Sequence, residues 1–263
     1  MDEILRPLAA PRHFLVVARV GDSSQHFAWV CGDPSRNWDL LVNYYGKRDD
    51  FEAGSAEYFS RRGISKFPGA SEIYAAAPFL LVSYDATIFI DDDIEVAAGD
   101  LSRLFERFVA HRLQLGQPAL SANSHFSHDV TIVNPTTIVR YTDFVEVMMP
   151  IFRREALGKC LPTFATSVSG WGLDWAWPSR IGFADRQTGI IDEVVLRHVK
   201  PVDPENGPFY RYLRSLGINP WTEMAGLLAK HGLRQTIPRQ LGSVRRPMNP
   251  NVLAMLTTRR GLI

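Results

Sequence analysis

Short apolar runs alternate with amphipathic stretches along this chain, a pattern typical of strands that alternate with helices. Six runs predict strands: His13–Arg19, Trp38–Tyr45, Ala86–Ile90, Val130–Val133, Phe144–Met149 and Gly189–Val199. Five stretches predict helices: Ile73–Val82, interrupted at Pro78, then Leu101–Leu115, Arg153–Lys159, Phe209–Leu216 and Thr222–His231. This alternation predicts an α/β sandwich around a central, mostly parallel sheet.

The composition is that of an ordinary globular protein. The chain has 263 residues, of which 46% are hydrophobic and 22% are charged. It shows no repeat and no long linker, so we expect a single domain over residues 1–263. The acidic start predicts no signal peptide, and no apolar stretch approaches the roughly 20 residues that span a bilayer. Cys31 and Cys160 form no disulfide framework, and these features together favour a cytoplasmic protein.

Positive charge is concentrated in a basic C-terminal segment, residues 201–263. Nine Lys or Arg against three acids give this segment a net charge of +6, whereas the rest of the chain carries −5. The whole chain carries only +1, which argues against a nucleic-acid partner. The segment predicts an anionic partner, either a diphosphate or a membrane surface carrying a lipid-linked substrate. An ordinary solvated basic face is the alternative. The arginines near its end are Arg245, Arg246, Arg259 and Arg260.

Three carboxylates directly follow a predicted buried strand. Asp91, Asp92 and Asp93 come after Ala86–Ile90 with no intervening polar residue. Ligands of open α/β sheets bind at the carboxyl ends of the strands. Crowded carboxylates repel one another unless a cation neutralises them, and oxygen ligands suit Mg²⁺ or Mn²⁺. The triplet therefore predicts a metal site, and a solvated turn is the alternative.

A second candidate region is rich in tryptophan and glycine. Residues 170–178 read Gly-Trp-Gly-Leu-Asp-Trp-Ala-Trp-Pro. Indole faces suit the apolar faces of sugar rings, and glycine lets a ligand approach the backbone. We therefore expect Trp171, Gly172 and Trp175 to bind a sugar or other acceptor, although packing alone would also explain the tryptophans. Asp174, desolvated among the indoles, suits a general base.

Polar residues at other predicted strand ends complete the candidate set. Arg19, Gly21 and Asp22 close the first strand in a turn that suits a nucleotide but lacks the spacing of a dinucleotide fingerprint or a P-loop. Asn43 and Tyr44 end the second strand and are candidates for contacts with a base or ribose. His198 lies in the last predicted strand, on the same face as Leu196. A lone strand histidine is more often a packing residue.

Together these features resemble the metal-dependent glycosyltransferases of the GT-A fold, whose Rossmann-like sandwich carries a strand running into Asp-x-Asp, a downstream acidic loop and a late histidine. The resemblance implies that Asp91 and Asp93 hold Mn²⁺ or Mg²⁺ on the diphosphate of a donor, that Asp92 contacts the donor, and that His198 is a further metal ligand. It also implies that Asp174 is the base, although these enzymes commonly carry a Glu-Asp pair where this chain has Leu-Asp-Trp.

Longer segments are similar to a bacterial and plant family labelled a domain of unknown function. The similarity runs from about His13 to Tyr210, and the label itself gives no reaction. The segments are VARVGDSS, RNWDLLVNYYG, FIDDDIEV, TDFVEVMMPIF and SGWGLDWAWP.

The sequence thus predicts a glycosyltransferase that moves a sugar from a nucleoside diphosphate sugar, a UDP-sugar, to a hydroxyl of a saccharide or another acceptor, with inversion. A metal-dependent phosphoesterase or nucleotidyltransferase would use the same acidic triplet. A carbohydrate-binding protein without catalysis would use the tryptophans alone.

Overall fold

A twisted ten-stranded sheet forms the centre of the molecule in the computed structural model, which describes residues 2–182 and 186–247. The strand order is β10-β7-β9-β6-β8-β4-β1-β2-β3, and β5 pairs with β9 beside this path. The strands are β1 Phe14–Val20, β2 Trp38–Tyr44, β3 Tyr58–Ser60, β4 Ala86–Asp91, β5 Ile94–Glu95, β6 Leu115–Leu120, β7 Thr137–Thr142, β8 Ile151–Arg153, β9 Thr188–His198 and β10 Gln240–Arg245.

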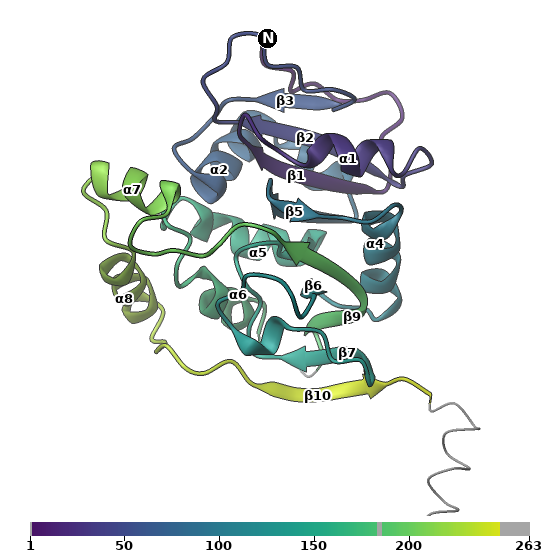
Figure 1. The fold of residues 1–263 in the computed structure, drawn as a ribbon, viewed down its shortest axis with the longest axis vertical. Helices are drawn as coiled ribbons and strands as arrows, with labels where there is room; N and C mark the ends of the chain where they lie inside the picture. Colours follow the sequence, from purple (N-terminus) through teal and green to yellow (C-terminus); the bar gives the residue numbers. More distant parts are fainter. Residues whose placement is uncertain (1, 183–185, 248–263) are drawn as a thin grey trace, which may run out of the picture.

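Helices cover both faces of the sheet (Figure 1), and each face has its own apolar core. One core includes residues of α1 and α4, and the other includes residues of α2, α5, α6 and α8. The helices are α1 His26–Cys31, α2 Lys66–Ala76, α3 Phe79–Ser83, α4 Asp100–Ala110, α5 Arg154–Phe164, α6 Leu173–Ile181, α7 Pro208–Ser215 and α8 Pro220–Lys230, with a 3₁₀ turn at Asp129–Thr131. The predicted α/β sandwich is confirmed.

The parallel strands bring their carboxyl ends to one edge. β1 lies between β2 and β4, parallel to both, and Arg19 is opposite Asn43 on one side and Asp91 on the other. These strands are buried on both faces, which explains why their sequences are almost continuously apolar. The pairs that involve β7, β8 and β10 are antiparallel. Most paired residues of the sheet nevertheless lie in parallel pairs, as predicted.

The last predicted strand, β9, returns to the end of β4. Its final residues pair antiparallel with the short β5, so that His198 lies opposite Ile94. The backbone N–H of Val199 also donates to the carbonyl of Asp93. Leu196 and His198 are buried whereas Arg197 is half-buried, as alternation predicted. This pairing brings a histidine from late in the chain beside the acidic triplet.

Three predicted helices differ clearly in their bounds. The helix predicted over Arg153–Lys159 is α5, which continues to Phe164. The helix predicted over Leu101–Leu115 ends at Ala110, because the chain turns at Arg112, whose φ is +55°, and then enters β6. The helix predicted over Ile73–Val82 begins earlier, at Lys66, and the break at Pro78 is confirmed.

Two predicted strands are wrong. Val130–Val133 overlaps the 3₁₀ turn, and Phe144–Met149 is an irregular segment. The second is apolar because it is packed beside β4, where the N–H of Asp91 donates to the carbonyl of Met148.

Residues 170–178, expected as a loop, instead begin α6 at Leu173. Short or polar strands such as β3, β7, β8 and β10 were not predicted, because their sequences carry little alternation.

The basic C-terminal segment is only partly described. From α8 the chain runs along one side of the molecule to β10, which pairs with β7 (Figure 1). Arg246 donates to the carbonyls of Thr137 and Asp192, and therefore helps to attach β10. Arg259 and Arg260 lie outside the described residues. Within residues 2–182 and 186–247, none of the helices has the length and apolar character needed to cross a membrane.

Candidate active site

The acidic triplet at the end of β4 has a different partner for each carboxylate. Asp91 Oδ1 accepts a hydrogen bond from Lys66 Nζ at 2.7 Å. Asp92 is buried, and its Oδ2 accepts the backbone N–H of Gly21 at 2.6 Å. Asp93 Oδ2 lies 3.5 Å from His198 Nε2. Burial raises the pKa of Asp92, and Lys200 Nζ lies 3.8 Å from its Oδ1.

Asp93 and His198 face each other and shift each other's pKa. His198 Nδ1 lies 2.8 Å from the carbonyl oxygen of His125, which can only accept, so Nδ1 carries the proton and Nε2 faces Asp93. Burial raises the pKa of Asp93, but the hydrogen bond and charge of His198 outweigh burial, so the pKa of Asp93 lies below its ordinary value. Burial alone would lower the pKa of His198, but Asp93 outweighs burial, so the pKa of His198 lies above its ordinary value. Lys200 Nζ adds a cation 3.8 Å from Asp93 Oδ2.

These residues fit a divalent cation in part. Asp93 Oδ1 is buried and has no hydrogen-bond partner among the described residues. A histidine whose other ring nitrogen donates to a carbonyl is the usual arrangement of a metal ligand. Asp91 Oδ1, by contrast, is engaged by Lys66. No group of three or more His, Cys, Asp or Glu side chains within the described ranges is arranged to hold a metal. The site therefore suits an ion that takes its remaining ligands from a phosphate and water.

The turn after β1 is fixed against the triplet. A Cβ on Gly21 would lie 2.7 Å from the hydroxyl of Tyr45, so a larger residue there would push the Tyr45 ring aside. Arg19 donates to the carbonyls of Arg62 and Gly63 at 2.9 and 2.8 Å, and its guanidinium carbon lies 5.3 Å from the centre of the Tyr45 ring. Burial lowers the pKa of Arg19 to about 10. Tyr45 itself is 52% exposed and is the accessible aromatic residue at this turn.

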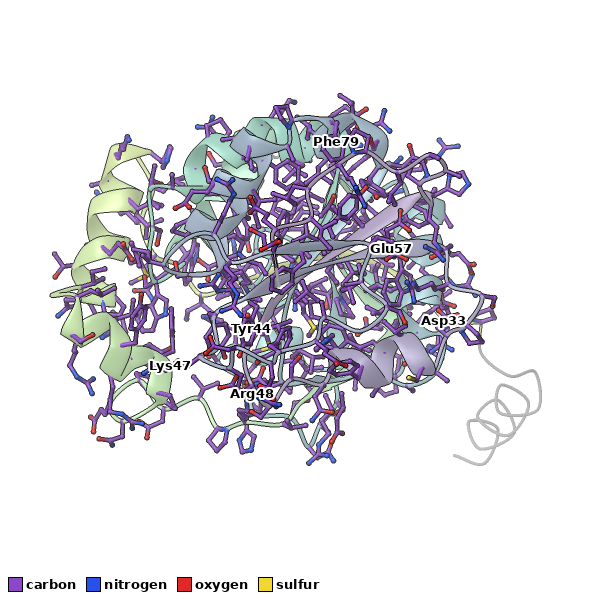
Figure 2. The ribbon with its side chains drawn as sticks, turned by 90° about the horizontal axis from the view of Figure 1, so that it is seen from above. Asp33, Tyr44, Lys47, Arg48, Glu57 and Phe79 are labelled. Carbon is purple, nitrogen blue, oxygen red and sulfur yellow. The ribbon has the colours of Figure 1, made fainter. Side chains whose placement is uncertain are left out.

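Asn43 and Tyr44 lie at the predicted edge but are both buried. Asn43 Nδ2 donates to the carbonyl of Arg62 at 3.1 Å. The Tyr44 hydroxyl donates to Asp22 Oδ1 and accepts the N–H of Arg48. Tyr44 and Arg48 lie on the same side of the molecule in Figure 2, together with Lys47. Their observed contacts hold the turns around the site in place.

Asp174 lies in the first turn of α6. The helix begins after Gly172, whose φ of +89° favours glycine. Asp174 is 5% exposed, and its Oδ1 accepts the N–H of Trp175 at 3.2 Å. Burial raises the pKa of Asp174 well above its ordinary value, and the charge of Glu146 raises it further. The carboxyl is thus desolvated, as the sequence predicted.

Helix α8 holds the segment that leads to α6. Glu223 accepts the backbone N–H groups of Val168 and Ser169 at 2.6 and 2.7 Å. It also accepts the hydroxyls of Ser167 and Ser169. A Cβ on Gly172 would lie 3.2 Å from Met224, so α8 also packs closely against this turn. The position of Asp174 therefore depends on α8.

The predicted tryptophans have different surroundings. Trp171 is half-buried and packs edge-on against Trp221, at 4.8 Å between ring centres, and near Tyr210 at 6.1 Å. Trp175 is 8% exposed, packs against Phe144, and donates its indole N–H to the carbonyl of Thr236. Trp171, Tyr210 and Trp221 form an aromatic group at the surface, whereas Trp175 faces the core.

Lys66 and Glu146 are among the residues of the site that were not predicted from the sequence. Lys66 Nζ joins Asp91 to the carbonyls of Val147 and Met148 at 2.5 and 3.0 Å. Glu146 is 4% exposed, and burial raises its pKa to about 7. Lys66 has no sequence signal, because its role depends on a contact across 25 residues. Glu146 had one: it is the single charged residue in the apolar run Phe144–Met149.

Comparison with solved structures shows the fold class. A structure of GalNAc-T7 with UDP, GalNAc and Mn²⁺ matches with a TM-score of 0.55 and 10% identity, over 84% of this chain and 51% of that one. Residues 1–349 of S. aureus TarS match with a TM-score of 0.53 and 11% identity, over 83% and 71% of the two chains. A longer TarS structure gives 0.50 and 11% over 83% and 43%.

The fold is therefore GT-A-like, as the motifs predicted, and this chain spans about half of the GalNAc-T7 chain. Neither a protein-family model nor a curated protein matches the sequence. The similarity to a domain-of-unknown-function family stays a prediction.

Proposed function

We propose that this chain is a single-domain, metal-dependent glycosyltransferase that transfers a sugar from a nucleoside diphosphate sugar, a UDP-sugar, to a hydroxyl acceptor. The observation that carries the proposal is the Asp93–His198 pair at the acidic triplet of a GT-A-like fold, and the desolvated Asp174 in α6 adds a candidate base. Asp93 and His198 suit the diphosphate end of a donor, and Asp174 suits the acceptor. Support for the nucleotide comes from GalNAc-T7, whose matching structure contains UDP and Mn²⁺.

The donor's nucleotide would lie along the ends of β1 and β2. Tyr45 offers an exposed aromatic face to the base, and Arg19 offers positive charge beside it. Gly21 lets the backbone approach the ligand, while Asp22, Asn43 and Tyr44 hold the surrounding turns. Asp92 fixes the turn through Gly21 and lies within reach of the ribose.

The metal site would use Asp93 and His198, with Asp91 joining if Lys66 moves to the phosphates. When bound, Mn²⁺ or Mg²⁺ would offset the negative charge of the leaving diphosphate. Lys66 and Lys200 supply positive charge from the protein for the same purpose.

Asp174 acts as the base in this proposal. It takes the proton of the acceptor hydroxyl, and the acceptor oxygen then forms a bond to the anomeric carbon. The bond from that carbon to the diphosphate oxygen breaks, and its electron pair leaves with the nucleoside diphosphate. Attack from the face opposite the leaving group inverts the anomeric carbon. A raised pKa makes Asp174 a better proton acceptor than an ordinary aspartate.

The acceptor would approach from the aromatic group. Trp171 and Gly172 lie immediately before Asp174 in the chain, and Trp171 packs with Trp221 and Tyr210. Aromatic faces of this kind suit the apolar faces of a saccharide. The buried Trp175 contributes by packing behind Asp174.

The alternative of a two-metal phosphoesterase or nucleotidyltransferase has less support. Such sites clamp two ions and need more ligands, and the described part of the chain contains no cluster of three or more metal-ligating side chains. The alternative of a non-catalytic carbohydrate-binding protein does not explain Asp93, His198 and Asp174, because the tryptophans alone would bind a carbohydrate.

The basic segment is proposed to face an anionic membrane that carries a lipid-linked acceptor. Vesicles containing phosphatidylglycerol should bind the protein at low salt and release it at high salt, because salt screens exposed charges. Replacing Arg245, Arg246, Arg259 and Arg260 by Gln should remove this binding. A melting curve is the control, since Arg246 also attaches β10. No vesicle binding at low salt would overturn this part of the proposal.

The direct test of function is the release of UDP from a panel of UDP-sugars, with Mn²⁺ or with EDTA. We expect metal-dependent release from at least one donor, faster when saccharide acceptors are added. Asp174→Asn separates catalysis from binding, because it keeps the shape of the side chain and removes the proton acceptor. A panel that shows no turnover and no nucleotide binding would overturn the proposal.

A further inference from the structure

Glu146 is a buried acid for which the proposed chemistry has given no role. It is 4% exposed, and its Oε2 has no hydrogen-bond partner among the described residues. Its backbone is held firmly, because its N–H donates to the Oε1 of the buried Gln117 at 2.6 Å. An unpaired buried polar atom is costly and calls for an explanation.

The neighbours of Glu146 place it at the centre of the site. The residues that follow it, Val147 and Met148, receive hydrogen bonds from Lys66, which also bonds Asp91. The charge of Glu146 acts on the pKa of Asp174, and the charges of His198 and Asp91 act on that of Glu146. Lys66 therefore ties the backbone next to Glu146 to the first carboxylate of the triplet, and the Glu146 carboxyl lies near enough to Asp174 for its charge to act on the proposed base.

A transferred sugar must occupy the same place. Its anomeric carbon is bonded to the diphosphate, which the proposed function puts at Asp91–Asp93, and is attacked by an oxygen held at Asp174. The ring must therefore lie within reach of both, next to Glu146. Tyr210, whose ring centre lies 6.1 Å from that of Trp171, is near enough to Glu146 for the charge of this carboxyl to add to the effect of burial, which raises the pKa of Tyr210. An aromatic ring beside a carboxyl suits a sugar, with one holding the apolar face and the other a hydroxyl.

We propose, on the basis of the function proposed above, that Glu146 holds a hydroxyl group of the transferred sugar and selects a neutral sugar over a uronic acid. The preference for a neutral sugar follows from the charges around the expected position of the ring. Asp91, Glu146 and Asp174 would surround the ring in this arrangement, and Lys66, the ammonium whose charge acts on Glu146, is already bonded to Asp91. A sugar carboxylate would add a further negative charge to this group.

The test compares the binding of UDP with that of UDP-sugars by isothermal titration calorimetry in Mn²⁺. The neutral probes are UDP-glucose, UDP-galactose and UDP-N-acetylglucosamine, and the charged probe is UDP-glucuronic acid. In Glu146→Ala, the affinity for the best neutral probe should fall roughly 10- to 100-fold, as expected for a lost hydrogen bond to a charged group. The affinity for UDP should stay within about twofold, as for a change that leaves the nucleotide contacts intact.

Two further variants sharpen the comparison. Glu146→Gln should retain most of the affinity for the neutral probe, because an amide also donates and accepts, and should gain affinity for UDP-glucuronic acid. The exposed Glu106 of α4 gives the matched control, Glu106→Ala, which should change nothing. If Glu146→Ala does not fold, Glu146→Asp is tested in its place, because its side chain is one methylene shorter and moves the carboxyl away from the sugar.

Three results would overturn the inference. Equal losses for UDP and for the neutral probe would mean that Glu146 acts on the nucleotide or the fold. Unchanged binding of every neutral probe would mean that Glu146 does not touch the sugar. UDP-glucuronic acid binding more tightly than the neutral probes would contradict the charge argument. A wild-type chain that binds no UDP in Mn²⁺ is a different outcome, because it overturns the proposed function itself and this inference with it.

Discussion

Replacing Glu146 by Gln should change how the stability of the protein depends on pH. An ordinary glutamate titrates near 4.5, whereas burial raises the pKa of Glu146 to about 7 in the folded chain. Between these two values the folded chain holds a proton that the unfolded chain has released. The free energy of unfolding therefore falls as the pH rises through this window, and the loss is complete above pH 7. Gln has the same shape and does not ionise, so the variant lacks this fall.

The size of the effect follows from the two pKa values. Their separation corresponds to about 3 kcal/mol of unfolding free energy, at about 1.4 kcal/mol for each pH unit. For a chain of this size, that difference is equivalent to roughly 6–12 °C in melting temperature. At pH 5 the unfolding free energies of the two proteins should differ by less than about 1 kcal/mol, because pH 5 is close to the lower end of the range in which the difference develops.

Urea unfolding at pH 5, 6, 7 and 8 in EDTA measures this directly. Wild type and Glu146→Gln should have similar stability at pH 5, and the variant should be the more stable by about 3 kcal/mol at pH 8. Glu106→Gln, on the exposed face of α4, is the control and should follow the wild type. Parallel curves for wild type and Glu146→Gln over the whole range would refute the reasoning, because Glu146 would then titrate alike in both states.

Three other substitutions test the site. Asp174→Asn should lower turnover on the order of 10²–10⁴-fold, measured as UDP release, while leaving UDP binding nearly unchanged; near-normal turnover would place the base elsewhere. Glu223→Gln turns its amide NH₂ toward one of the two N–H groups of residues 168 and 169, which then loses its acceptor, so the melting temperature should fall by roughly 5 °C. Glu205→Gln, on an exposed loop, should melt like the wild type, and equal melting of both variants would contradict the role of Glu223. Gly172→Ala must adopt a φ of +89°, so it should lower both the melting temperature and turnover; normal values of both would show that the turn tolerates a side chain.

The sequence was most informative where burial imposes a simple pattern. β1, β2 and β4 are parallel and buried on both faces, so their nearly continuous apolar runs could be recognised, and with them the edge where Asp91 lies. Alternation along β9 also gave the correct face for His198. The partner of His198 could be proposed only through the family resemblance, because the β5–β9 pairing that joins it to Asp93 spans about a hundred residues.

The rest depended on contacts that no local pattern encodes. The run Phe144–Met149 has the composition of a strand, but its burial comes from packing beside β4, and this made the prediction wrong. β10 is an exposed edge strand of mixed polarity that is defined by its pairing with β7. Lys66 and Glu223 act through bonds to distant backbone groups. Such residues become recognisable only once the chain has folded.

The central claim is that Asp93 and His198 bind a nucleoside diphosphate together with a divalent cation. Isothermal titration calorimetry of UDP tests it most directly, with wild type and Asp93→Ala, each in Mn²⁺ and in EDTA. We predict that wild type binds UDP in Mn²⁺ and loses most of this affinity in EDTA. Asp93→Ala should bind equally weakly in both and keep its far-ultraviolet circular dichroism spectrum. Equal affinity of wild type and Asp93→Ala for UDP in Mn²⁺ would contradict the account.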